Sequence, residues 1–195
     1  MNQFPATRER VRTLAVFNII AGAVGLFAAF ELATEYIKKL KNPEYVTNCD
    51  LSILVTCGPN MESWQGSVFG FSNTILGLMM FTAPIFVGAA LLAGARFNRF
   101  FWLLYLAGLT FGIGFVFWLS FQSIFIIGTL CPWCMVVWTA TIPLFWINLS
   151  FALKHGVFGR KLPGLASWSW VAILASYLLI AVMAQANLNW IGQIF

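Results

Sequence analysis

The sequence is poor in charge. Charged side chains make up only 9% of its 195 residues, whereas soluble globular domains usually contain about 25%. This shortage excludes an ordinary soluble fold, and the hydrophobic share of 61% points the same way. The 20 Phe and nine Trp suit a lipid-facing surface with aromatic residues at its edges. We therefore predict an integral membrane protein.

Motifs for common cofactors are also missing. The sequence contains no dinucleotide-binding motif, no phosphate-binding loop and no pair of histidines for haem, because His155 is its only histidine. The net charge of +5 does not indicate nucleic acid, since the basic residues stand in short connectors and form no patch. No internal repeat divides the chain, so we predict a single membrane domain over residues 1–195. We expect no nucleotide and no metal.

Long apolar runs stand where such motifs are absent. A membrane-spanning helix needs about 20 mostly apolar residues, and five stretches meet that length: 14–33, 74–95, 100–127, 131–153 and 168–188. The third is longer than a straight crossing requires, which predicts tilt or an interfacial end. We expect one compact bundle with the last span at its edge.

Small residues within the spans suit close packing of helices. Gly108 and Gly112 have the GxxxG spacing in the third span, and Gly22 and Gly25 lie in the first. We predict that both pairs are packing positions.

The distribution of basic residues predicts an orientation. Short inner segments of membrane proteins are enriched in Lys and Arg, and an inner N-terminus places eight of the eleven basic residues inside. Only Lys38, Lys39 and Lys41 would then lie outside. We therefore expect the loop 36–73 and all four cysteines on the outer, extracytoplasmic face, where disulfides persist.

Two of the four cysteines open the fourth span, in the sequence Cys131-Pro132-Trp133-Cys134. Proline suits the first position of a helix, so we predict that Cys131 is the N-cap. Residues three apart share a helix face, and the N-terminus of a helix favours a negatively charged thiolate. The pair is therefore suited to disulfide exchange, in which a thiolate is the nucleophile.

The other two cysteines, Cys49 and Cys57, lie in the loop sequence NCDLSILVTCGPN. Gly58 and Pro59 follow the second thiol, and a segment rich in turn formers can be mobile. A mobile cysteine pair beside a fixed pair is the arrangement that an electron relay requires. Since the chain carries no other acceptor motif, the electron sink within reach of a membrane pocket is a lipid-soluble quinone.

Three other interpretations of the cysteines stay open. They could form two structural disulfides that hold the outer loop, or a four-thiolate zinc site. They could also be unpaired apolar residues of the core. The spacing C-x7-C, then a long gap and C-x2-C, is poor for zinc, and the CxxC geometry disfavours unpaired residues. An exchange-active pair accounts best for the pattern.

Over residues 14–153 the chain resembles the vitamin K epoxide reductase family in its bacterial branch. The resemblance rests on CD at Cys49–Asp50, a second loop cysteine at Cys57, SW at Ser63–Trp64, FSNTILG at Phe71–Gly77 and CPWC at Cys131–Cys134. It implies an all-α integral membrane fold, in which a four-helix transmembrane bundle surrounds a quinone and a fifth transmembrane helix follows. Many bacterial members continue into a thioredoxin-like domain, but only seven residues follow Leu188. The resemblance therefore implies a separate, secreted DsbA-like partner of thioredoxin fold.

The same resemblance implies a path for electrons. They would run from the partner to a Cys49–Cys57 disulfide, then to Cys131 and Cys134, and then to menaquinone or ubiquinone. Cys57 would exchange with Cys131, and Cys134 would face the quinone. These four cysteines are thus the predicted catalytic residues.

Three further residues join Cys134 in the predicted quinone site. Asn73 matches a family asparagine that hydrogen-bonds a quinone carbonyl, although a role as helix N-cap of the second span explains it equally well. Trp138 stands four residues after Cys134 and could line the pocket, or be an interfacial or core tryptophan. Ser63, from the SW motif, completes the set.

The resulting hypothesis is a quinone-linked thiol–disulfide oxidoreductase of a bacterial cytoplasmic membrane, which generates disulfides by reoxidising its secreted partner. A vitamin K epoxide or quinone reductase that uses the same cysteines is the alternative within the family. A non-catalytic membrane protein with structural disulfides is the alternative outside it. Asp50 and Glu62 have no part in the hypothesis and are interpreted as solvated loop charges.

Overall fold

The computed structural model describes residues 8–188, and over that range the regular structure is helical. Its five long helices are α1 (Arg8–Lys41), α3 (Asn73–Leu92), α4 (Arg99–Phe121), α5 (Pro132–His155) and α7 (Ser169–Leu188). Each is long and apolar enough to cross a membrane. The prediction of an all-α, multi-pass membrane fold is confirmed. Residues 1–7 and 189–195, which belong to the predicted membrane domain, lie outside the described residues.

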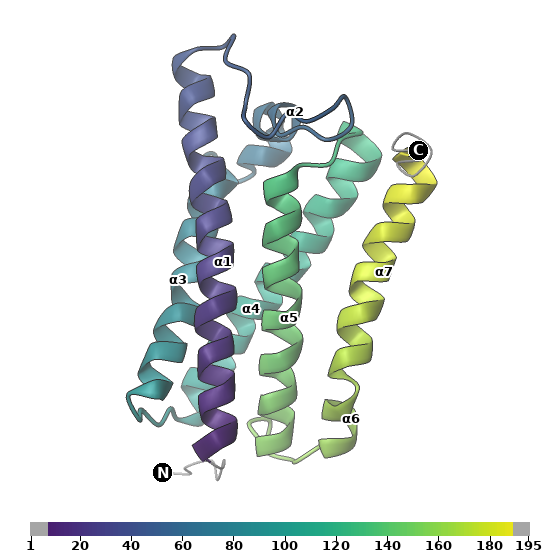
Figure 1. The fold of residues 1–195 in the computed structure, drawn as a ribbon. Helices are drawn as coiled ribbons and strands as arrows, with labels where there is room; N and C mark the ends of the chain where they lie inside the picture. Colours follow the sequence, from purple (N-terminus) through teal and green to yellow (C-terminus); the bar gives the residue numbers. More distant parts are fainter. Residues whose placement is uncertain (1–7, 189–195) are drawn as a thin grey trace.

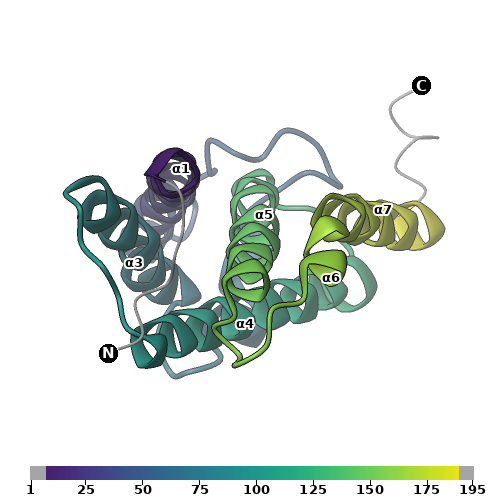
Figure 2. The ribbon, with the colours of Figure 1, turned by 90° about the horizontal axis from the view of Figure 1, so that it is seen from below.

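Four of these helices form a bundle, and the fifth lies beside it. Figures 1 and 2 show α1, α3, α4 and α5 grouped together, with α7 against the outer side of α5. Hydrogen bonds to α5 help to fasten α7: Trp146 Nε1 donates to Ser176 Oγ (3.2 Å), and the Tyr177 hydroxyl donates to the Thr139 carbonyl oxygen (2.9 Å). The short helix α6 (Pro163–Ser167) makes the turn between α5 and α7.

The ends of the spans differ from the sequence prediction in two places. Helix α1 continues to Lys41, about two turns beyond the predicted span 14–33, and so projects above the other helices at the cysteine end (Figure 1). The long third span is not one α-helix, because it closes in a π-helical turn, η2 (Gln122–Ile127). That turn stops at Gly128, whose φ of 79° is a left-handed conformation that glycine adopts without strain. The extra length of the third span is therefore used to turn the chain toward Cys131.

The connection between α1 and α3 contains more helix than the sequence indicated. The short helix α2 (Gly58–Glu62) begins directly after Cys57, with Pro59 in its first turn. A 3-10 turn, η1 (Trp64–Ser67), follows it. Together they lie across the cysteine end of the bundle (Figure 1).

Glycines bring α1 and α3 into close contact. An added Cβ at Gly22 would lie 2.8 Å from Ile85 Cγ1, and one at Gly25 would overlap the ring of Phe81. The prediction of a packing role is therefore confirmed for the first span. It is wrong for Gly108, because a Cβ there would meet nothing within 4 Å.

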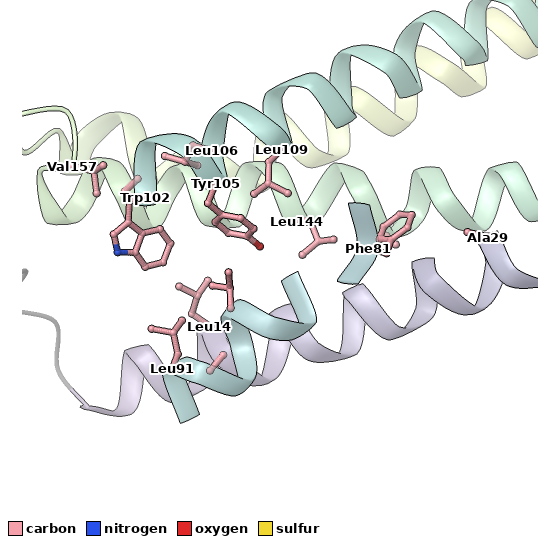
Figure 3. Close-up of a cluster of buried hydrophobic side chains, with 14 residues drawn as sticks. Leu14, Ala29, Phe81, Leu91, Trp102, Tyr105, Leu106, Leu109, Leu144 and Val157 are labelled. Atoms are coloured by element: carbon pink, nitrogen blue, oxygen red, sulfur yellow. The ribbon is translucent and has the colours of Figure 1, made fainter. Parts of the chain in front are cut away.

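Apolar side chains from all four bundle helices form the core. Figure 3 shows Leu14 from α1, Phe81 from α3, Leu109 from α4 and Leu144 from α5 gathered between the helices. These side chains are almost completely removed from the surface. The outward faces of the helices carry exposed Phe and Leu instead, as expected for a surface in contact with lipid.

A buried polar cluster joins three of the helices in the half of the bundle away from the cysteines. Asn18 and Asn148 exchange amide hydrogen bonds of 3.2 and 3.0 Å, and the Tyr105 hydroxyl donates to Asn18 Oδ1 (2.7 Å). Each amide also donates to a carbonyl oxygen of its own helix. Polar groups at membrane depth must find partners within the protein. This cluster therefore sets how α1, α4 and α5 lie against one another.

Gly88 offers a direct test of the contact between α1 and α3. An added Cβ would lie 2.5 Å from the Ala15 carbonyl oxygen and 2.7 Å from Ile19 Cγ1, so Gly88→Ala must push the backbones apart. We expect it to lower the free energy of unfolding by about 1–3 kcal/mol, seen as a lower melting temperature in detergent. Gly114→Ala is the control, because a Cβ there has open space within 4 Å. Equal melting temperatures for the two variants would contradict this description of the packing.

Candidate functional site

The four cysteines meet at one end of the bundle. Cys49 and Cys57, in the connection between α1 and α3, form a disulfide, whereas Cys131 and Cys134 at the start of α5 are free thiols. Cys131 is the N-cap of α5, and its Sγ accepts from the Cys134 backbone N–H at 3.4 Å. The predicted capping role of Cys131, with Pro132 in the first turn, is confirmed.

The two cysteine pairs touch. Cys131 Sγ lies 3.3 Å from Cys57 Sγ. Cys57 and Cys131 have no exposed surface, and Cys49 is 4% exposed. Leu32 and Met61 pack around the three sulfurs. A thiolate at Cys131 would be in position to attack the loop disulfide without a large movement of either segment.

A short backbone pairing fixes this contact. Residues Val55 and Leu130 form an isolated parallel β-bridge. The Thr56 N–H donates to the Leu130 carbonyl oxygen at 3.0 Å, and the Leu130 N–H donates to the Leu54 carbonyl oxygen at 2.7 Å. Since Thr56 precedes Cys57 and Leu130 precedes Cys131, the bridge holds the two cysteines next to each other.

Asp50 is an exposed loop residue, as interpreted from the sequence, but it is more than a solvated charge. Its carboxylate accepts from the Thr56 hydroxyl, from the Cys57 N–H (2.9 Å) and from the Thr47 N–H (3.2 Å). Burial acts to raise the pKa of Asp50, but the hydrogen bonds from Thr56, Thr47 and Cys57 outweigh it and hold this pKa below its usual range. The carboxylate therefore organises the disulfide loop at neutral pH, and it loses these bonds only when the pH falls through the lowered pKa.

Glu62 is nearer to the prediction, because its side chain is 56% exposed and pairs with Lys39 at 3.5 Å. The loop around the disulfide is bonded at several points. Asp50 ties its two cysteine ends together, and the β-bridge ties it to the start of α5.

A cavity lies directly below the cysteines. It has a volume of about 150 Å³ and is lined by residues of α1, α3, α4 and α5, of the short helix α2 and of the turns η1 and η2. Its walls are mostly apolar, and cavities of this size can hold an aromatic ring. Cys134, Asn73 and Trp138 all line it. The cavity is therefore in contact with the second thiol of the CxxC pair.

Asn73 supplies an unpaired polar atom at this cavity. Its Nδ2 donates to the Gln65 carbonyl oxygen at 2.6 Å, while its buried Oδ1 has no partner among residues 8–188. The N-cap of α3 is Ser72, whose hydroxyl accepts from the Thr74 N–H, so the alternative role of Asn73 as the cap is wrong. A buried polar group without a partner requires an explanation.

The remaining predicted quinone residues differ in position. Trp138 is 5% exposed and forms part of the cavity wall. Ser63 is not among the lining residues, and its hydroxyl donates to the Asn60 carbonyl oxygen at 2.9 Å. Gly108 and Gly112 line the cavity, which explains why the GxxxG spacing does not bring a helix close.

The described part of the chain, residues 8–188, contains no group of three or more His, Cys, Asp or Glu side chains that could hold a metal ion. In particular, Cys49 and Cys57 are bonded to each other. This arrangement does not have the four free thiolates that a zinc site with four cysteine ligands needs.

Together these features define a helical membrane bundle with a disulfide, a dithiol and an apolar cavity at one end. A sequence profile of the vitamin K epoxide reductase family matches residues 16–149, from α1 to most of α5. The chain belongs to the vitamin K epoxide reductase family, a family of oxidoreductases. Among curated proteins no match was found.

Proposed function

We propose that the protein is a thiol:quinone oxidoreductase that generates disulfides by reoxidising a secreted, DsbA-like partner of thioredoxin fold. One observation carries this proposal: Cys131 contacts Cys57 of the loop disulfide at 3.3 Å, while Cys134, three residues on, lines the cavity. A route for electrons from the loop to the cavity thus needs only these thiols. A protein held by two structural disulfides would have no free dithiol between its disulfide and its cavity.

The thiol steps balance without any further reactant. The partner's dithiol reduces the Cys49–Cys57 disulfide and leaves oxidised. The Cys57 thiolate then attacks Cys131 in a Cys131–Cys134 disulfide and releases the Cys134 thiolate, and Cys49 attacks Cys57 to re-form the loop disulfide. The products are a loop disulfide and a reduced CxxC pair, which is the redox state of the structure.

The apolar character of the cavity supports the choice of a quinone. A quinone ring is flat and mostly apolar, so its site should be apolar with a few placed polar groups, and this cavity has Trp138 and Asn73 beside Cys134. When bound, a quinone accepts two electrons and two protons. The second N–H of Asn73 can donate to a quinone carbonyl, and its unpaired Oδ1 can accept from a hydroxyl of the reduced form.

The distribution of basic residues supports the proposed orientation. Lys38, Lys39 and Lys41 are the basic residues that an inner N-terminus would place outside. Lys38 pairs with Glu35 at 2.8 Å and Lys39 pairs with Glu62 at 3.5 Å. Eight of the eleven Lys and Arg residues of the chain remain on the inner side, and this excess supports a cytoplasmic N-terminus and extracytoplasmic cysteines in a bacterial membrane.

Trapping of a mixed disulfide tests the relay. Without Cys134, the bond between Cys131 and the loop loses one of the two thiols that can resolve it, and only Cys49 remains. We expect Cys134→Ser to accumulate a Cys57–Cys131 disulfide with Cys49 free, as found by peptide mapping after rapid alkylation. Adding Cys131→Ser to this variant should abolish that bond. If Cys131 is never joined to either loop cysteine, the two pairs do not exchange electrons.

Replacement of Asn73 tests the quinone site. Loss of a donor to an oxygen that gains negative charge typically slows a reaction by about 10²–10³-fold. Asn73→Ala should therefore slow reduction of menaquinone or ubiquinone to that degree in stopped-flow measurements, while exchange between the partner and the loop disulfide keeps its rate.

Asn98→Ala is the matched control for Asn73→Ala. It removes the same amide from the N-cap of α4, where the side chain accepts from the Phe101 N–H at 2.9 Å. It should cost about 1 kcal/mol of stability and leave the quinone step unchanged. Equal slowing of both half-reactions by Asn73→Ala would show that the residue has no specific role at the quinone.

A further inference from the structure

Glu35, near the outer end of α1, is a buried carboxylate. Its side chain is 0% exposed. It accepts from the Asn48 N–H at 2.9 Å, from Lys38 Nζ at 2.8 Å and from the Tyr45 hydroxyl at 3.4 Å. Burying a carboxylate is costly unless it is paired and hydrogen-bonded. Glu35 lies in the part of α1 that extends beyond the predicted span 14–33. Two of its three hydrogen-bond partners, Tyr45 and Asn48, lie in the loop between α1 and α2 that carries Cys49.

These bonds hold the segment 45–48 against α1. Lys39 Nζ adds a bond to the Tyr45 carbonyl oxygen at 3.2 Å. Asn48 is the residue directly before Cys49, and its N–H is bound to Glu35 itself. Glu35 thus fixes the backbone on the Cys49 side of the disulfide, whereas the β-bridge fixes the Cys57 side.

The orientation of the disulfide matters because either sulfur of a disulfide can be attacked. In the structure Cys57 faces Cys131 at 3.3 Å, and Cys49 Sγ lies 3.7 Å from the Thr47 hydroxyl. The Cα atoms of Cys49 and Cys57 are only 5.8 Å apart. A small rotation of the Cys49 side could therefore change which sulfur faces Cys131.

We infer that Glu35 is a positioning residue that makes Cys57, and not Cys49, the sulfur that exchanges with Cys131. The inference rests on the proposed relay. In the relay the Cys57 thiolate attacks Cys131. In the reverse step, which a variant without Cys134 follows, the Cys131 thiolate attacks Cys57 Sγ, the Cys57–Cys131 bond forms as the Cys49–Cys57 bond breaks, and Cys49 leaves as a thiolate. The step is redox-neutral and leaves Cys49, on the outer segment, free for the partner.

The test measures which mixed disulfide forms in the full chain. In a Cys134→Ser parent, peptide mapping gives the ratio of Cys57–Cys131 to Cys49–Cys131. Adding Glu35→Ala should lower this ratio about tenfold, the effect expected for losing a hydrogen bond to a charged group. A loss of general stability would reduce the amount of folded protein without changing the ratio.

Two further variants make the outcome specific. Glu35→Gln keeps an acceptor for the Asn48 N–H and should hold the ratio within about twofold of the parent. Glu31→Ala removes a carboxylate one turn earlier on α1 that has no hydrogen bond to the loop among the described residues, and it should leave the ratio unchanged.

The possible failures are distinguishable. If the parent forms neither mixed disulfide, the proposed relay itself is wrong. If the parent forms Cys57–Cys131 but Glu35→Ala does not shift the ratio, the relay stands and the role of Glu35 is overturned. An equal shift in Glu31→Ala would also overturn it, because the effect would not belong to the bonds that Glu35 makes.

Discussion

The contact between Cys57 Sγ and Cys131 Sγ, at 3.3 Å, joins two segments that are 74 residues apart in the chain. Holding it requires each segment to be fixed in space. The start of α5 is fixed by the helix itself, since Cys131 is its N-cap. The loop has no long helix of its own at this point, so it is held by the β-bridge to Leu130 and by the carboxylate of Asp50. The helix cap, the β-bridge and the hydrogen bonds of Asp50 together meet this requirement.

Helix α5 carries both free thiols and places one of them, Cys134, at the cavity. Cys131 and Cys134 are three residues apart, so one faces the loop while the other lines the cavity beside Trp138. This geometry separates the sulfur that contacts the loop disulfide from the sulfur at the cavity by less than one helical turn. The bundle below keeps its helices in position around the cavity, through the polar cluster of Asn18, Asn148 and Tyr105 and through the glycines of α1.

Local patterns predicted much of this arrangement. The five spans, the capping position of Cys131 and the family all follow from apolar runs and short motifs in the sequence. The bonds of Asp50, the polar cluster of Asn18 and the open space at Gly108 do not, because each depends on partners that another helix or loop supplies. A glycine pair with GxxxG spacing has the same sequence whether a helix or a cavity faces it. The position of Ser63 away from the cavity lining was not predictable for a related reason, since a motif gives a residue's position in the chain but not the direction of its side chain.

The most direct test of the account is anaerobic mixing of the fully reduced protein with menaquinone or ubiquinone, followed by quinone absorbance and by titration of the remaining thiols. The account predicts that quinone is reduced as thiols disappear, up to one quinone for each of the two cysteine pairs, with disulfides formed in both. A quinone absorbance that stays constant while all four thiols of the chain remain titratable would contradict it.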